Sequence, residues 1–214
     1  MAKKKGGSPV GKLLMVLGLA LVLGAGGLYG YNQYVDYQAG QASENAAMEL
    51  VQEITTQQVS IKDKPVVSAK SEAEEEEPPV ELMKVAELNG AYYMGVITIP
   101  KLERILPVQS DWSESKLKRT PCRYFGSLED GGLVIAGHNY RTHFSKLSSL
   151  SHGDSVVFTD LEGNQYFYEV REVCTLDGSD VEGMTQSGYD LSLFTCNYDG
   201  KARITVRCTR VEAN

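Results

Sequence analysis

The sequence predicts a mainly β domain, a closed or nearly closed barrel with short helices, that follows an N-terminal transmembrane helix and a flexible stalk. Three observations lead to this prediction: an uncharged apolar run near the N-terminus, an acidic middle segment, and seven strand-like runs after Gly90. Residues 1–12 carry a charge of +4, residues 36–89 one of −8 and residues 90–214 one of −3, which add up to the net charge of −7. This balance makes nucleic-acid binding an unfavoured main role.

The apolar run at residues 13–31 has the length of a transmembrane anchor. It contains no charged residue, and at about 1.5 Å per residue a helix of this length approaches the thickness of the hydrocarbon core of a bilayer. The four lysines of residues 1–12 predict a basic cytoplasmic tail, with everything after the anchor outside the cell. A cleaved signal peptide is the alternative. We favour the retained anchor, because the run is long for a signal sequence and no clear small-x-small site follows it closely.

Residues 32–89 are predicted to form an acidic extracellular stalk. Gln, Ala, Ser, Glu and Lys dominate this segment, and the acidic run at residues 74–77 is followed by Pro78 and Pro79. Because sustained apolar periodicity is short, no core offsets the entropy cost of ordering the segment. We expect one brief amphipathic helix at residues 48–54, and we interpret the acidic run as a self-repelling spacer rather than a site for cations or wall polymers.

Residues 90–214 are predicted to form the barrel. Runs rich in β-branched and aromatic residues alternate with turn sequences such as Glu-Asp-Gly-Gly at residues 129–132, and only residues 144–150 suggest a helical turn. We find no strand–helix–strand alternation, no glycine-rich phosphate loop and no paired Cys-x-x-Cys, which disfavours a dinucleotide-binding domain or a zinc site. The strand-like runs are residues 95–99, 104–108, 133–137, 155–159, 165–173, 191–196 and 202–209.

Three residues at the ends of predicted strands have the side chains needed for nucleophilic catalysis. Cys196 ends the run LSLFTC, His138 follows the run LVIAG, and Arg203 opens the last run. A thiolate can attack a carbonyl carbon, an imidazole transfers protons near neutral pH, and a guanidinium can stabilise an oxyanion. Taken singly, each is more often a packing, surface or edge residue. Their joint placement at strand ends indicates a site.

The sequences around these residues resemble the signatures of the sortase family. The matching segments are GLVIAGHNY at residues 132–140, LSLFTC at residues 191–196, KARITVRC at residues 201–208 and GVITIPKLERILPV at residues 95–108. The resemblance extends over about residues 95–209 and keeps the family's order of His, then Cys, then Arg. It implies a sortase-type eight-stranded β-barrel and a membrane-anchored cysteine transpeptidase.

The resemblance also implies a role for each candidate residue. Cys196 would attack the carbonyl carbon before the scissile bond of a C-terminal sorting motif on an exported protein, forming a thioester. His138 would protonate the leaving amine and later help to deprotonate the incoming one, and Arg203 would bind the substrate carbonyl or the oxyanion. The acceptor amine would belong to a cell-wall peptidoglycan precursor or to a pilin lysine. This chemistry requires no metal and no organic cofactor.

Thr195 and Asn139, the neighbours of the cysteine and the histidine, are further candidates for substrate binding. Asn139 makes the sequence Gly-His-Asn, which is similar to class B sortases. Only the fourteen residues 175–188 separate two predicted strands here, too few for the long helical insert expected of class B. The class is left open between B-like and D-like.

Arg207 is the rival of Arg203, because both positions lie on one face of a strand by the period-two rule. We favour Arg203, since at about 3.3 Å per residue Arg207 lies roughly 13 Å further from the barrel rim. Two other functions stay open: an extracellular cysteine peptidase or hydrolase, and a noncatalytic anchored β module in surface assembly. The pairing of the four cysteines in this exported part also stays open.

Overall fold

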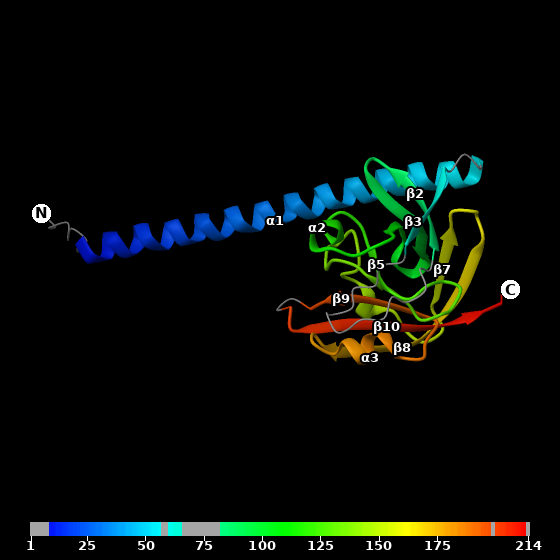
Figure 1. Cartoon of the computed structure of the whole chain (residues 1–214). Coiled ribbons are helices and arrows are strands. Elements are labelled where there is room, and N and C mark those ends of the chain that lie inside the picture. Colours follow the sequence, from blue (N-terminus) through cyan, green and yellow to red (C-terminus); the bar gives the residue numbers. More distant parts are fainter. Residues whose placement is uncertain (1–8, 57–59, 66–81, 198–199, 213–214) are drawn as a thin grey trace, which may run out of the picture. The chain divides into compact units, whose positions relative to one another are not determined.

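The computed structural model describes residues 9–56, 60–65, 82–197 and 200–212 (Figure 1). The chain divides into two compact units, residues 1–38 and residues 39–214. Helix α1 (Pro9–Thr56) begins in the first unit and ends in the second, which also holds all the strands of the described chain. The acidic run that the sequence analysis interpreted as a spacer lies outside the described residues.

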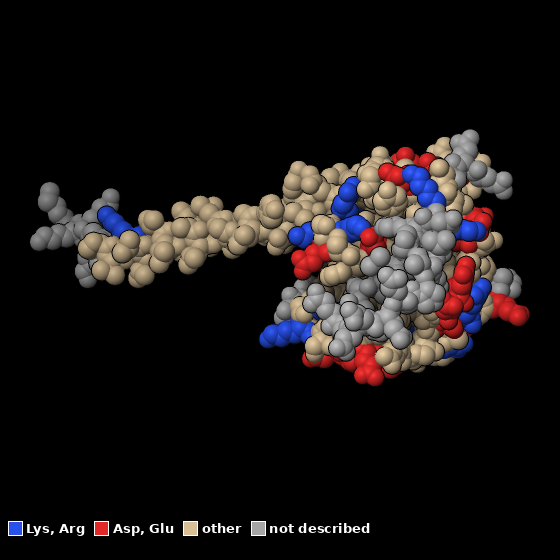
Figure 2. All heavy atoms as spheres, in the orientation of Figure 1, with Lys and Arg blue, Asp and Glu red and all other residues tan. Residues whose placement is uncertain are grey.

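The first half of α1 contains the predicted anchor. One helical window there reaches a mean hydropathy of 2.1 with none of its residues buried, so the helix is long and apolar enough to cross a membrane. Residues 13–31 carry no charge, and Figure 2 shows this stretch of the helix without charged surface. Leu13, Leu21 and Leu28 are each at least two-thirds exposed, as side chains facing lipid would be.

The second half of α1 belongs to the barrel unit, although the sequence predicted a stalk there. Residues 39–56 are helical, and β1 (Ile61–Pro65) pairs with β2 (Leu82–Leu88), which in turn pairs with the barrel. Ala46 and Leu50 of the helix pack with strand residues and with Leu161 in one apolar cluster. The helical face is made mostly of small residues. It therefore gave a weak hydrophobic signal, although small side chains allow close packing.

Among the described residues, eight strands close into a barrel, as predicted. Each of the seven predicted runs overlaps one of these strands. Of the eight barrel strands only β5 was not predicted, because its four residues give little periodic signal. Strands β1 and β2 were also not predicted, since they lie in the segment interpreted as a stalk. The order around the barrel is β3 (Ala91–Ile99), β4 (Arg104–Gln109), β5 (Cys122–Phe125), β6 (Leu133–Ala136), β9 (Leu191–Cys196), β10 (Ala202–Val211), β8 (Gln165–Asp177) and β7 (Ser155–Asp160). The pairing of β7 with β3 closes the ring.

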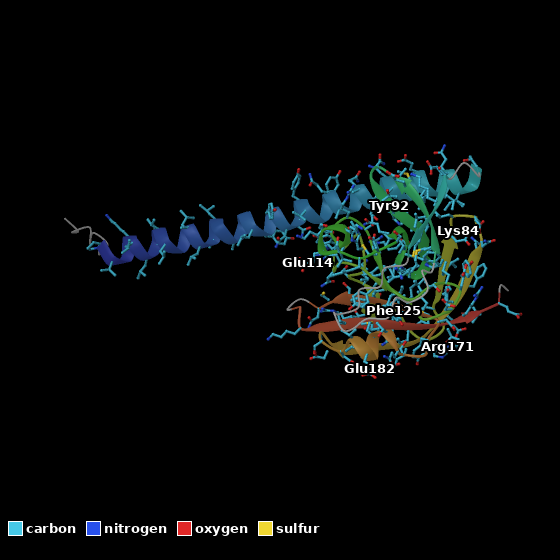
Figure 3. The ribbon with its side chains drawn as sticks, in the orientation of Figure 1. Lys84, Tyr92, Glu114, Phe125, Arg171 and Glu182 are labelled. Carbon is cyan, nitrogen blue, oxygen red and sulfur yellow. The ribbon has the colours of Figure 1, made fainter. Side chains whose placement is uncertain are left out.

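Alternate residues of the central strands face two different apolar clusters. Leu191 and Leu193 of β9 point into the barrel core, whereas Phe194 joins Val134 and Met184 in a second cluster on the outer face. Two short helices, α2 (Glu114–Leu117) and α3 (Val181–Thr185), pack against this outer cluster. Figure 3 labels Glu114 on α2 and Glu182 on α3. The 3₁₀ turns are η1 (Pro100–Leu102) and η2 (Leu147–Ser149), and η2 falls within the helical turn predicted at residues 144–150.

Candidate active site

The strand register places Cys196 and Arg203 opposite each other. Strands β9 and β10 are antiparallel, and the two residues are direct partners in that pairing. Direct partners have their side chains on the same face, with Cβ atoms about 5 Å apart. Asn197 fixes this end of the hairpin, because its backbone N–H donates to the carbonyl of Ala202 at 2.9 Å and its side-chain oxygen accepts from the N–H of Ala202 at 3.1 Å. The thiol and the guanidinium therefore meet at one strand end.

The register also brings His138 to this end of the sheet. Strand β6 runs parallel to β9, with Ala136 paired to Phe194, and the N–H of Gly137 donates to the carbonyl of Phe194 at 2.9 Å. His138 lies two residues beyond Ala136, and Cys196 lies two residues beyond Phe194. The neighbouring chains thus place His138 level with Cys196, and the strand order β6–β9–β10 puts the cysteine between the histidine and the arginine.

The imidazole of His138 is held by its own loop. The ring of Tyr140 stacks on it, with a centroid separation of 3.9 Å and an interplanar angle of 8°. The N–H of Phe144 donates to the carbonyl of His138 at 3.2 Å. Gly137 is required beneath this loop, because a Cβ there would lie 2.2 Å from the Phe144 ring. The sequence Gly-His therefore reflects a close approach of the loop to the strand end.

A groove of about 430 Å³ opens beside Cys196 on the outer face of the sheet. Its lining is largely apolar and also includes Arg203 and two carboxylates. His138 is not among its lining residues. The lining residues are Trp112, Leu117, Tyr124, Asp177, Gly178, Asp180, Val181, Met184, Phe194, Cys196 and Arg203; we call this the Cys196 groove.

Three aromatic rings form a continuous wall of the Cys196 groove. Trp112 meets Tyr124 edge-on at 6.1 Å, and Tyr124 meets Phe194 edge-on at 5.3 Å. The loop that carries Trp112 is held at both ends by one hydrogen bond. The buried side-chain amide of Gln109, before the loop, donates to the carbonyl of Lys116, after it, at 3.1 Å. The sequence analysis missed this wall. The only signal was the single tryptophan of the chain, placed in a polar loop.

Arg207 lies on the same strand face as Arg203 but is enclosed. Its guanidinium donates to the hydroxyl of Ser192 at 2.7 Å, to the carbonyl of Met184 at 3.2 Å and to the carbonyl of Gly183 at 2.5 Å. Only 3% of Arg207 is exposed. It therefore joins α3 to the sheet, and Arg203 is the arginine that reaches the Cys196 groove.

The two minor candidates do not line the groove. Thr195 faces the barrel interior, since it alternates with Phe194 and Cys196, and its buried hydroxyl has no hydrogen-bond partner among the described residues. Asn139 is half-buried beside His138 and is also absent from the groove lining. The structure thus brings Cys196, His138 and Arg203 to one strand end and leaves the hydroxyl of Thr195 on the other face of the sheet.

The four cysteines are all in the described part of the chain, and each is a free thiol. Burial raises the pKa of Cys122 and of Cys208 to about 12. Burial also raises the pKa of Cys174, with a further increase from the charge of Glu172. These three thiols therefore stay protonated near neutral pH, and only thiolates attack readily. Cys196 is the cysteine that lines the groove.

Asp177 contributes a negative charge beside Arg203. Hydrogen bonds from the hydroxyl and the N–H of Ser179 lower the pKa of this carboxyl, and the nearby Arg203 lowers it further. Asp180 is used locally, since it accepts from the N–H of Gly183 at 2.8 Å as the cap of α3. Within the described ranges, no group of three or more His, Cys, Asp or Glu side chains is arranged to hold a metal ion.

A thiol between an imidazole and a guanidinium, at the mouth of an apolar groove, is the arrangement of a cysteine acyltransferase or peptidase. Comparison with known proteins names the family. The model of the sortase domain matches residues 97–211, more than half of the chain. The chain therefore belongs to the sortase family of cysteine transpeptidases, and the resemblance noted in the sequence is confirmed.

Solved structures agree with this assignment. Sortase C1 from Streptococcus agalactiae is 27% identical, with a TM-score of 0.52 over 60% of this chain and 72% of that one. Sortase C1 from Streptococcus suis is 25% identical, with a TM-score of 0.51 over 57% and 74% of the two chains. A sortase D5 transpeptidase from Clostridium perfringens, 22% identical, shares the fold with a TM-score of 0.51 over 56% and 79%. No curated protein sequence matches the chain.

Proposed function

We propose that this chain is a membrane-anchored sortase that cleaves a C-terminal sorting motif of exported proteins and transfers the acyl group to an amine. The observation that supports this most directly is the register of three neighbouring strand ends, which sets Cys196 opposite Arg203 and level with His138. A nucleophile, a proton carrier and a fixed cation then lie within reach of a single peptide bond.

The first half-reaction forms a thioester. The Cys196 sulfur attacks the carbonyl carbon before the scissile bond, and the charge that develops on the carbonyl oxygen is stabilised by N–H groups of Arg203. His138, as imidazolium, gives its proton to the departing amine as the carbon–nitrogen bond breaks. Tyr140 keeps the imidazole in one orientation by stacking on it, which favours proton transfer in a fixed geometry.

The second half-reaction returns the enzyme to its starting state. An acceptor amine attacks the thioester carbonyl, His138 takes up the proton that the amine loses, and Cys196 leaves as a thiolate. The new bond is an amide, so the energy of the original peptide bond is conserved in the product. A peptidoglycan precursor or a pilin lysine provides such an amine.

The Cys196 groove supports a peptide substrate with apolar residues before the scissile bond. Trp112, Tyr124 and Phe194 form a wall that leads along the sheet to the thiol. An extended peptide lying along this wall presents alternate side chains to it. Burial of apolar side chains there contributes binding energy of about 25 cal/mol per Å².

The apolar half of α1 supports anchoring in a cell membrane. In our proposal residues 13–31 cross the bilayer once, with residues 1–12 in the cytoplasm and the barrel outside. The four lysines at residues 1–12 favour that orientation. The enzyme would then meet its substrates at the outer membrane surface, where exported proteins with a sorting motif emerge.

The test is mass spectrometry of the full chain, in lipid vesicles, after incubation with a library of sorting-motif peptides. We expect a mass increase at Cys196 and, with an added amine, a product that contains this amine. Cys196→Ala should abolish both. Cys174→Ala, which removes another partly exposed thiol of the same domain, should retain both. Release of free acid only, with or without the amine, would instead indicate a hydrolase, and absence of any adduct would indicate a binding module.

A further inference from the structure

The second half of α1 lies directly on the loop that follows His138. A Cβ atom added at Gly40 would be 2.5 Å from Cγ2 of Thr142 and 3.0 Å from its Cβ, so the helix and the loop touch with no space for a side chain. Neighbouring positions on the same helical face are also small and buried. These are Ala39, Ser43, Ala46 and Ala47.

The loop at residues 138–146, which we call the histidine loop, is fixed on both sides of this contact. Before Thr142, the guanidinium of Arg104 on β4 donates to the carbonyl of Arg141 at 2.9 Å. After Thr142, the N–H of His143 donates to the carbonyl of Tyr140 at 3.0 Å, and the imidazole of His143 is buried. We therefore expect a displacement of Thr142 to shift the whole histidine loop, since hydrogen bonds hold the residues on both sides of Thr142.

The same loop determines where the catalytic imidazole lies. The carbonyl of Tyr140 accepts hydrogen bonds from the N–H groups of His143 and Ser145, so the residues around Thr142 set the position of Tyr140. The Tyr140 ring in turn stacks on His138 at 3.9 Å. Helix contact, loop backbone and stacked ring form one continuous path from Gly40 to His138.

We propose that Gly40 is a positioning residue, and that residues 39–47 of α1 hold the histidine loop so that His138 faces Cys196. This inference rests on the proposed function and extends it, because the helix beyond the anchor becomes part of the support of the active site. The barrel strands alone place Cys196 and Arg203 through their own pairing. The histidine lies beyond the end of β6 and depends on its loop.

The test compares Gly40→Ala with Gly30→Ala in the full chain in lipid vesicles. Both changes remove a helical glycine, so both favour the helix by about 1 kcal/mol. Only Gly40→Ala meets Thr142, whereas a Cβ at Gly30 has nothing within 4 Å. We expect Gly40→Ala to lower kcat of acyl transfer by about tenfold, since a shift well below 1 Å misaligns the proton donor. KM and the melting temperature should change little.

A second substitution should restore the activity. Thr142→Ser removes Cγ2, the atom that a Cβ at Gly40 would meet at 2.5 Å. The double variant Gly40→Ala, Thr142→Ser should therefore regain most of the lost kcat, with Thr142→Ser alone as the reference for that recovery. If Gly40→Ala lowers only the melting temperature, or if Thr142→Ser gives no recovery, the contact has no positioning role and the inference is overturned.

The position of His138 can also be read without any substrate. In protein labelled with ¹³C at histidine Cε1, the His138 signal is shielded by the stacked Tyr140 ring, and a His138→Gln variant assigns it among the three histidines. Gly40→Ala should move this signal toward its unstacked value, and Gly30→Ala should not. An unchanged signal overturns the inference while leaving the proposed function intact. Failure of the unmodified chain to form a thioester overturns the proposed function, and the signal still decides the inference.

Discussion

The two ends of the pairing between β9 and β10 carry the same residue type on the same face of β10, in opposite surroundings. Arg207 is enclosed and donates to the hydroxyl of Ser192 and to two carbonyls of α3. Arg203, four residues earlier, is half-buried, donates to the carbonyl of Gly200 at 3.1 Å and reaches the Cys196 groove. Surrounding residues enclose the Arg207 end of this pairing, which we call the closed end, and the Arg203 end, which we call the open end, borders the Cys196 groove.

This contrast shows how the sheet can be both a scaffold and a site. At the closed end, Arg207 satisfies carbonyls at the end of α3 and so fixes Met184, which lines the Cys196 groove. At the open end, in the proposed mechanism, N–H groups of Arg203 that do not bind Gly200 donate to an oxyanion. The closed end should therefore control stability, and the open end should control chemistry.

The largest expected effect is at the open end. Arg203→Ala should lower the rate of thioester formation by about 100- to 1000-fold, because removal of one oxyanion donor commonly has this cost. The melting temperature should stay close to that of the unmodified protein, since the Arg203 guanidinium is hydrogen-bonded to the carbonyl of Gly200 in the neighbouring turn and not to a distant element of the described chain. Single-turnover acylation kinetics and thermal unfolding measure the two quantities. If Arg203→Ala instead lowers the melting temperature strongly and acylates at the normal rate, Arg203 is the structural arginine and the comparison with Arg207 is wrong.

At the closed end, Arg207→Met should lower the free energy of unfolding by about 3 kcal/mol. Methionine fills much of the space but leaves the carbonyls of Gly183 and Met184 without this donor, and each unsatisfied buried acceptor costs about 1–3 kcal/mol. Urea denaturation followed by circular dichroism gives the value. If Arg207→Met slows acylation more than Arg203→Ala does and leaves stability unchanged, the oxyanion role belongs to Arg207.

The sequence distinguished these two arginines by distance alone. The period-two rule placed both on one face, and the length of the strand favoured Arg203 at the rim. What encloses Arg207 was not predictable, because α3 has five residues and α2 has four, too few for a periodic signal. The barrel strands were predictable, since every second side chain of each strand faces one large core. The catalytic role of Arg203 stays a prediction until the kinetics are measured.

The buried thiols of the barrel make the stability of the enclosed part of the molecule depend on alkaline pH. Cys208, in the barrel core, has its pKa raised to about 12 from an ordinary value of 9.0. The folded protein thus holds this proton more tightly than the unfolded chain, so the stabilisation is complete below pH 9 and is lost as the pH rises toward 12. Cys122 behaves in the same way, and Tyr168 does so above pH 10.

We therefore expect the free energy of unfolding to fall with pH above 9, by up to about 1.4 kcal/mol per pH unit for each buried thiol. Cys208→Val should flatten the curve between pH 9 and pH 11, because valine has no proton to lose and suits a buried strand position. Urea denaturation at a series of pH values measures the slopes, and equal slopes for Cys208→Val and the unmodified protein would contradict the argument.

The smallest expected effect concerns Ser192, the residue that faces Arg207 across the strand pair. Its hydroxyl accepts from the Arg207 guanidinium at 2.7 Å, and the residue is buried. Ser192→Ala removes one of three acceptors and should lower the free energy of unfolding by about 1 kcal/mol, since the two α3 carbonyls still bind the guanidinium. In the double variant with Arg207→Met, the further loss from Ser192→Ala should nearly vanish, because the shared hydrogen bond is already gone. Full additivity would mean that Ser192 stabilises the strand independently of Arg207, and the closed end would then not act as one unit.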